Sequence, residues 1–113
     1  MVASGVITGQ TGSASLVNYT PVSSGIYRVS IFIFVNVAGG SGCALNSGAY
    51  VFPAAGVAAG SGLPLGCTSP NTAGQVEYEG YWVAGQNLTK GVTQSGTAGS
   101  LSYTASYSIT RMQ

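Results

Sequence analysis

The chain has 113 residues, of which 45% are apolar, and only five side chains are charged, giving a net charge of +1. It contains no Asp and no His, so it lacks most of the side chains that serve acid–base catalysis, catalytic triads and metal binding. We therefore expect no enzyme, no cofactor and no metal ion. The length suits one domain, whose folding buries roughly two-thirds of the surface of the unfolded chain.

Positive charge is too sparse for two classes of partner. Nucleic acids and anionic membranes select proteins with a basic stripe or patch, which three scattered Lys and Arg residues do not form. The longest apolar run, 31–35, is too short to span a bilayer, and the N-terminus lacks the basic start and apolar stretch of a signal peptide. We expect a protein that is used as translated, with no nucleic acid and no membrane among its partners.

The first residues, 1–12, are expected to form an N-terminal arm with a short strand at 5–8, ahead of a single domain over 13–113. In that domain apolar residues recur at every second position instead of at the helical spacing, and the whole chain contains 18 Gly. Both features favour strands over helices. The first strand of the domain is predicted at 14–19.

The clearest strand is predicted over 25–37. Its odd positions form an unbroken apolar face that should point into a core: Tyr27, Val29, Ile31, Ile33, Val35 and Val37. The even face carries Ile26, Phe32 and Phe34 on the side expected to meet water. Either these residues form a subunit interface, or a second sheet covers them. We prefer the interface, because a strand of a sandwich normally has one buried face.

The two cysteines, Cys43 and Cys67, lie close to the Gly-rich stretches 38–42 and 60–62. If these loops meet, the cysteines could form a disulfide, and two reduced thiols are the alternative. A zinc site needs four close ligands, which this sequence does not supply. A short strand is predicted between the cysteines at 49–52.

The strand predicted at 75–83 places Val76, Tyr78 and Trp82 on one face, and Glu77, Glu79 and Tyr81 on the other. Planar rings stack on sugars, so Tyr81 and Trp82 are the candidate contacts of a glycan-binding module. Alternating positions more often put Trp82 in the core, which leaves Tyr81 as the exposed ring. Glu77 and Glu79 are expected to be solvated residues at the edge of a sheet and not a catalytic pair. Arg28 or Lys90 could form an ion pair with them.

The last strands are predicted at 87–93 and 99–112. In the second of these the odd positions face the core and the even positions are mostly Ser and Thr; the core positions are Leu101, Tyr103, Ala105, Tyr107 and Ile109. Seven or eight short antiparallel strands on one core predict an all-β fold. We expect an antiparallel β-sandwich of the jelly-roll type.

Three segments resemble parts of small jelly-roll domains in virion proteins of tailed bacteriophages. Residues 16–30 (LVNYTPVSSGIYRVS) resemble the segment that leads into their first long strand, 83–89 (VAGQNLT) their A-G-x-x-I/L-T element, and 101–109 (LSYTASYSI) their last strand. The same elements occur in trimeric jelly rolls related to the C1q and tumour-necrosis-factor heads. Residues 39–74, which are richer in Gly and Ala, depart from the pattern.

The resemblance implies a virion building block that forms a homotrimer with Ile26, Phe32 and Phe34 near the subunit contact. It is expected to be a capsid decoration (cement) protein that contacts the major capsid protein, within a virion assembled in the host cytoplasm. A tail-fibre or tailspike tip is less expected, because no coiled coil or repeated shaft is present. A carbohydrate-binding, receptor-recognition module is the competing class.

Overall fold

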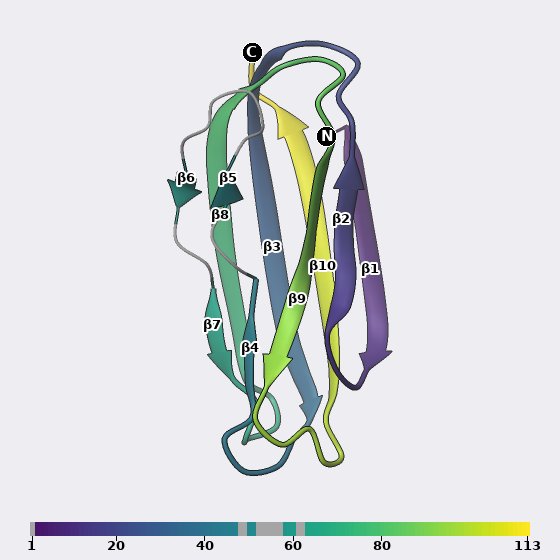
Figure 1. Cartoon of the computed structure of the whole chain (residues 1–113), viewed down its shortest axis with the longest axis vertical. Helices are drawn as coiled ribbons and strands as arrows, with labels where there is room; N and C mark the ends of the chain where they lie inside the picture. The colour runs from purple at the N-terminus through teal and green to yellow at the C-terminus, as the bar shows by residue number, and fades with distance from the viewer. Residues whose placement is uncertain (1, 48–49, 52–57, 61–62) are drawn as a thin grey trace.

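The computed structural model describes residues 2–47, 50–51, 58–60 and 63–113, and within these ranges the chain forms strands and no helix. The ten strands are β1 Ala3–Gln10, β2 Ala14–Tyr19, β3 Gly25–Val37, β4 Ala44–Asn46, β5 Tyr50–Val51, β6 Ala58–Gly60, β7 Pro64–Gly66, β8 Ala73–Trp82, β9 Leu88–Ser95 and β10 Ser102–Arg111. Both ends of the chain lie at the same end of the molecule (Figure 1).

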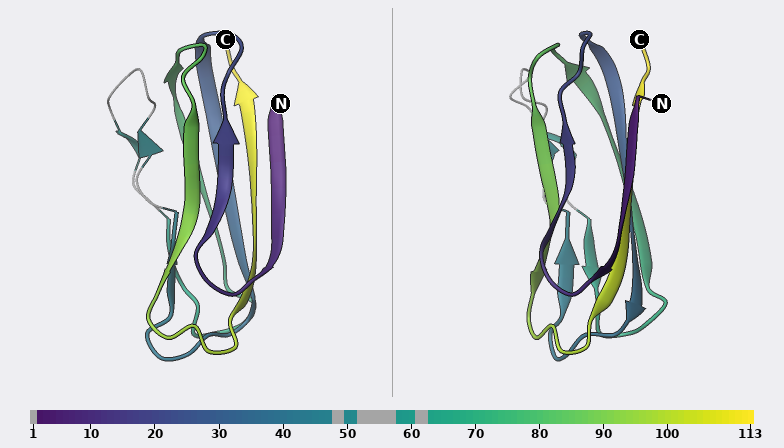
Figure 2. Two further views of the ribbon diagram at one scale, coloured as in Figure 1. Left: turned by 45° about the vertical axis from the view of Figure 1, so that its right-hand side comes forward. Right: turned by 90° about the vertical axis from the view of Figure 1, so that its right-hand side faces the viewer.

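The strands pair as one long hairpin. β1 pairs with β10, β2 with β9, β3 with β8, β4 with β7 and β5 with β6, always antiparallel. Rolling this hairpin up brings β10 against β3 and β9 against β4. Two four-stranded sheets result, with the orders β1-β10-β3-β8 and β2-β9-β4-β7, and Figure 2 shows them as facing layers. This nested pairing is a jelly roll, which confirms the predicted fold class.

The core lies between the two sheets, because each sheet points every second side chain inward. From β3 it contains the five predicted residues Tyr27, Val29, Ile31, Ile33 and Val35, all buried. The opposite sheet contributes Val17, Leu45, Leu88 and Val92. The prediction is wrong for Val37, which is 47% exposed, because it lies at the end of β3 where the register with β10 shifts.

One end of the core is an aromatic cluster that is tied to the neighbouring loops. The Trp82 ring meets Tyr19 and Tyr27 edge to face, with ring centroids 5.5 and 5.4 Å apart. The Trp82 indole N–H donates to the Gln86 carbonyl at 2.7 Å, and the Tyr27 hydroxyl donates to the Ser23 carbonyl. Since the polar tips have partners, the Trp82 and Tyr27 rings can be buried at little cost.

Two further buried hydroxyl groups connect loops to the core. The Tyr103 hydroxyl donates to the Gly12 carbonyl at 2.6 Å in the β1–β2 loop, and burial raises the pKa of this phenol, which keeps it a donor. Ser47, which is 2% exposed, accepts from the Leu63 N–H at 2.9 Å and lies 3.4 Å from the Tyr78 hydroxyl. These bonds hold together chain segments that are far apart in the sequence.

The N-terminal arm predicted over 1–12 is wrong. From Ala3 to Gln10 this segment is β1, which pairs with β10 between Ala3↔Ile109 and Gln10↔Tyr103. The reason is that β1 buries Ala3 and Ile7 against the core while it hydrogen-bonds to β10, although β1 then forms the edge of the sheet itself. Gly9, with a φ of +62°, lies where the register shifts, shortly before the chain turns into β2. The folded domain therefore includes β1.

The other strand boundaries agree with the sequence pattern to different degrees. The predictions for 14–19 and 25–37 coincide with β2 and β3. In the strand predicted at 49–52, Tyr50–Val51 is β5, whereas residues 49 and 52 lie outside the described ranges, as do 61–62 of the Gly-rich stretch. The three-residue strands β4, β6 and β7 were not predicted.

Candidate interaction surface

The side of the β1-β10-β3-β8 sheet that faces away from the core is the candidate functional surface, and we call it the outer face. Phe32 and Phe34 project from it, because they alternate along β3 with the core residues. Phe32 is 41% exposed, and Phe34 and Ile26 are half-buried. The second sheet packs against the opposite side, so the alternative in which it covers these rings is wrong.

The neighbours of the two rings are small or flexible. Phe32 lies between Ser106 on β10 and Gln75 on β8, and beyond Ser106 the same row continues to Val6, which is 66% exposed. Phe34 is flanked by a Thr and an Ala. Because no large side chain stands beside them, the rings remain accessible. The sequence pattern missed Val6, which belongs to the segment expected to be an arm.

Exposed apolar side chains are concentrated on this sheet. Among the residues of the strands other than β5 and β6, the large apolar side chains that are exposed are Val6, Phe32, Val37 and Tyr81. Val37 continues the inward-pointing row of β3, so the outer face carries the other three. The outer side of the β2-β9-β4-β7 sheet carries polar groups instead; for example, Asn87 donates to Asn18 and accepts from Thr89, both at 2.8 Å. An apolar surface on one side of a small domain marks an interaction site.

A hollow of about 200 Å³ lies beside Phe32 on the outer face. Its walls include Ser30, Phe32, Gln75, Ser106 and Ser108, which come from three adjacent strands. The hollow exists because the three serines leave space next to one large ring. It therefore combines an aromatic wall with hydroxyl and amide groups.

The charged residues of β3 and β8 form one group on the outer face. Arg28 Nη2 donates to Glu79 Oε2 at 3.0 Å, and Arg28 Nε lies 3.9 Å from Glu77 Oε2. The Ser30 hydroxyl donates to Glu77 Oε1 at 3.3 Å. The predicted pairing with Arg28 is confirmed. Since these side chains are 41–50% exposed, the pairing contributes at most about 1 kcal/mol to stability.

Replacing both carboxylates, Glu77→Gln with Glu79→Gln, is expected to change the free energy of unfolding by less than about 1 kcal/mol, because both side chains stay in water. Urea denaturation of the double variant and the wild type measures the change. A loss above about 2 kcal/mol would mean that the carboxylates are buried in the assembled protein.

The two candidate glycan contacts lie on opposite sides of the sheet. Tyr81 is 50% exposed on the outer face of β8. Trp82 is 0% exposed, so its selection as a glycan contact is wrong: its ring is enclosed by Tyr19 and Tyr27 and has no free face for a sugar. A stacking platform built from both rings is therefore excluded.

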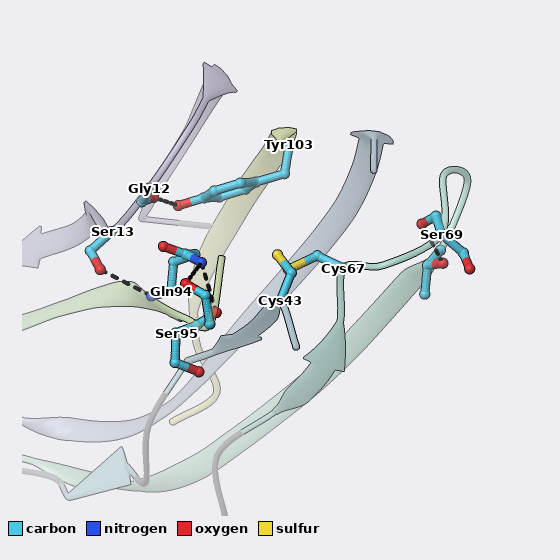
Figure 3. The surroundings of a disulfide bond; sticks show 10 residues. Gly12, Ser13, Cys43, Cys67, Ser69, Gln94, Ser95 and Tyr103 are labelled. Atoms are coloured by element: carbon cyan, nitrogen blue, oxygen red, sulfur yellow. Dashed lines mark hydrogen bonds between the residues drawn. A yellow bond between two sulfur atoms is a disulfide. The ribbon is translucent and has the colours of Figure 1, made fainter. Parts of the chain in front are cut away.

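Cys43 and Cys67 are joined by a disulfide in the structure (Figure 3). Their α-carbons are 5.1 Å apart, and both side chains are buried. The bond lies just ahead of β4 and just after β7, where the Cys67 N–H also donates to the Cys43 carbonyl at 3.0 Å. A Cβ on Gly39 would lie only 2.5 Å from the Cys43 sulfur, so this glycine lets the backbone pass close to the disulfide.

The described residues contain no group of three or more His, Cys, Asp and Glu side chains that could hold a metal ion. Within the same ranges, no helix is long and apolar enough to cross a membrane.

Comparisons with known proteins add little to this description. No family model matches the chain, and no curated protein matches it in sequence. Among solved structures, the chain is similar to one of infectious bursal disease virus (Gx strain), with 15% sequence identity and a TM-score of 0.38. The match covers 94% of this chain and 28% of the viral chain, so it spans little more than a quarter of that protein. A likeness of this degree supports no conclusion about family or function.

Proposed function

We propose that this protein is a structural subunit of a virion that assembles with copies of itself, as a homotrimer, through the outer face. The observation that carries the proposal is the placement of Phe32 and Phe34 on that face, together with the exposed Val6 and Tyr81. Rings that remain in contact with water in one copy are a favourable place for a second copy to pack.

The rings mark the position of the contact but do not supply all of its energy. Phe32 is already more than half buried, so covering the rest of it contributes only about 1 kcal/mol. Association costs at least about 4 kcal/mol. A stable contact must therefore use much of the sheet. The molecule measures 42 by 22 by 17 Å, and its broad side is large enough for the roughly 800 Å² per partner of a standard interface.

The low charge of the chain agrees with this role. The outer face carries one small group of charges, in which Arg28 partly neutralises the carboxylates of Glu77 and Glu79. The net charge of the chain is only +1. A surface of this kind does not repel a second copy of itself.

The resemblance to small jelly rolls of tailed bacteriophages supports capsid decoration as the particular role. A trimer bound where copies of the major capsid protein meet would add buried area across their contacts and strengthen the shell. The virion, assembled in the host cytoplasm, is the corresponding location. The alternative is the tip of a tail fibre or tailspike. A glycan-binding role is weakened, because Trp82 is buried and only Tyr81 remains exposed.

The oligomeric state tests the proposed contact. We expect wild-type protein to sediment with three times the 11.3 kDa mass of one chain, and Phe34→Asp to sediment as a monomer, because three unpaired carboxylates would be buried at the contact. Phe32→Asp, at a more exposed position, serves if the first variant misfolds. The control Ser15→Asp, which is exposed on β2 of the other sheet, should remain a trimer. A monomeric wild type would refute the contact.

The place in the virion needs a separate experiment. Electron cryo-microscopy of native particles, with mass spectrometry of their protein content, should find the chain in trimers on the capsid shell. Density for the chain at the tail tip would favour the alternative role. If purified particles do not contain the chain, a virion role is refuted altogether.

A further inference from the structure

We propose that Tyr81 of one copy inserts into the hollow beside Phe32 of the next copy, and that this contact closes the trimer. The inference rests on the proposed function and specifies how the outer faces fit together. It assigns Tyr81 to self-assembly and not to glycan binding.

The hollow has the size for one side chain. Its volume of about 200 Å³ is below the range of about 300–1,000 Å³ that is usual for small-molecule sites. Phe32 offers a ring as one wall, and Ser30, Ser106 and Ser108 offer hydroxyl groups that can both donate and accept hydrogen bonds. The matching ligand is therefore a planar ring that carries a hydroxyl group.

Tyr81 has the chemistry and the exposure that the hollow requires. Its side chain is 50% exposed on the outer face of β8, which is an edge strand of its sheet. A tyrosine can pack its ring against Phe32 edge to face and direct its hydroxyl to the serines, so that neither part is left unsatisfied. Val6 and Val37, the other exposed large apolar residues of the strands outside β5 and β6 apart from Phe32, match only the apolar wall.

Tyr81 cannot reach the hollow of its own copy. It pairs with Ile26 on β3, whereas Ser106 pairs with Phe32, six residues further along the same strand. At about 3.3 Å per residue, the two positions are roughly 20 Å apart. The contact must therefore join two copies through different patches, and such head-to-tail contacts form closed rings when the rotation allows. A threefold ring is the state proposed above.

Cysteine cross-linking tests this contact. In the double variant Tyr81→Cys with Ser106→Cys, a short bismaleimide that spans the space left by the Tyr81 ring should produce covalent dimers and closed trimers on denaturing gels, with peptide mass spectrometry showing the 81–106 link. The reaction is run at a protein concentration high enough to offset the loss of the Tyr81 ring. Within one chain the two positions are roughly 20 Å apart, so a short cross-linker cannot join them there. Each single variant should give no 81–106 product. The matched control, Tyr81→Cys with Ser15→Cys on the other sheet, should give no 81–15 product.

A second variant tests the same contact without added thiols. Tyr81→Ala should weaken trimer formation roughly 30-fold, as expected for an aromatic anchor, whereas Tyr81→Phe, which keeps the ring, should weaken it less. If the wild type is a trimer, the double cysteine variant gives no 81–106 link and Tyr81→Ala still forms trimers, the insertion is refuted but not the trimer. A wild-type monomer would refute both proposals, and equal cross-linking in the control pair would show that the reaction is not site-specific and refute the insertion.

Discussion

Replacing Trp82 by alanine is expected to lower the free energy of unfolding by about 3–5 kcal/mol. The Trp82 side chain is 0% exposed and packs against Tyr19 and Tyr27, so its removal leaves a large cavity at one end of the core. It also leaves the Gln86 carbonyl without the indole donor. Urea denaturation followed by circular dichroism, at one fixed protein concentration because the subunits associate, measures the loss.

Two controls separate the packing of Trp82 from its hydrogen bond and from general effects of substitution. Trp82→Phe keeps a ring in the core but removes the indole N–H, so its stability should lie between those of the wild type and Trp82→Ala. Val22→Ala, at a position that is 92% exposed, should change stability by less than about 0.5 kcal/mol. Since Trp82 is the single tryptophan of the chain, its fluorescence should resist iodide quenching. If iodide quenches the fluorescence of Trp82 and Trp82→Ala has the denaturation midpoint of the wild type, Trp82 lies on the surface and the assignment to the core is wrong.

The long strands were predictable because their side chains alternate over many residues. In β3 the unbroken row of Tyr27, Val29, Ile31, Ile33 and Val35 identifies the buried face, and the opposite face is then fixed as the outer one. This is why the positions of Phe32 and Phe34 followed from the sequence. The same logic placed Trp82 in the core, although the presence of several rings together also suggested a glycan site.

The short strands could not be predicted for a physical reason. β4 and β7 have three residues each, which is fewer than an alternating pattern needs to be recognised. They are strands because β9 and the disulfide hold them in place. β1 is a related case: Val6, Ile7 and Thr8 favour a strand, which was predicted at 5–8, but the extension to Ala3–Gln10 and its place in the sheet depend on pairing with β10.

The hollow on the outer face also lay beyond the sequence pattern. Its walls come from β3, β8 and β10, so its existence depends on the register that puts Ser106 and Gln75 on either side of Phe32. Register between strands that are distant in the sequence is a property of the fold and not of local alternation. The pattern could therefore identify an apolar face, but not the shape of its surface.

Replacing Cys43 and Cys67 together by alanine is expected to lower the free energy of unfolding by about 3–4 kcal/mol. The disulfide closes a loop with a sequence separation of 24 residues, and the chain-entropy relation gives a loss of this size when such a loop is opened in the unfolded state. Alanine is the appropriate replacement, because both positions are buried and serine would bury a hydroxyl group. Denaturation in urea without reductant measures the difference from the wild type.

A reducing agent provides the control for the cysteine variant. It should lower the urea midpoint of the wild type to that of the double alanine variant and leave the variant unchanged. If reductant does not affect the wild type, the cysteines are reduced thiols. The disulfide belongs to the β4–β7 end of one sheet, whereas the proposed subunit contact belongs to the outer face of the other. The cysteine variant should therefore lose stability but still form trimers, while Phe32→Asp should lose the trimer and keep most of the stability of the fold.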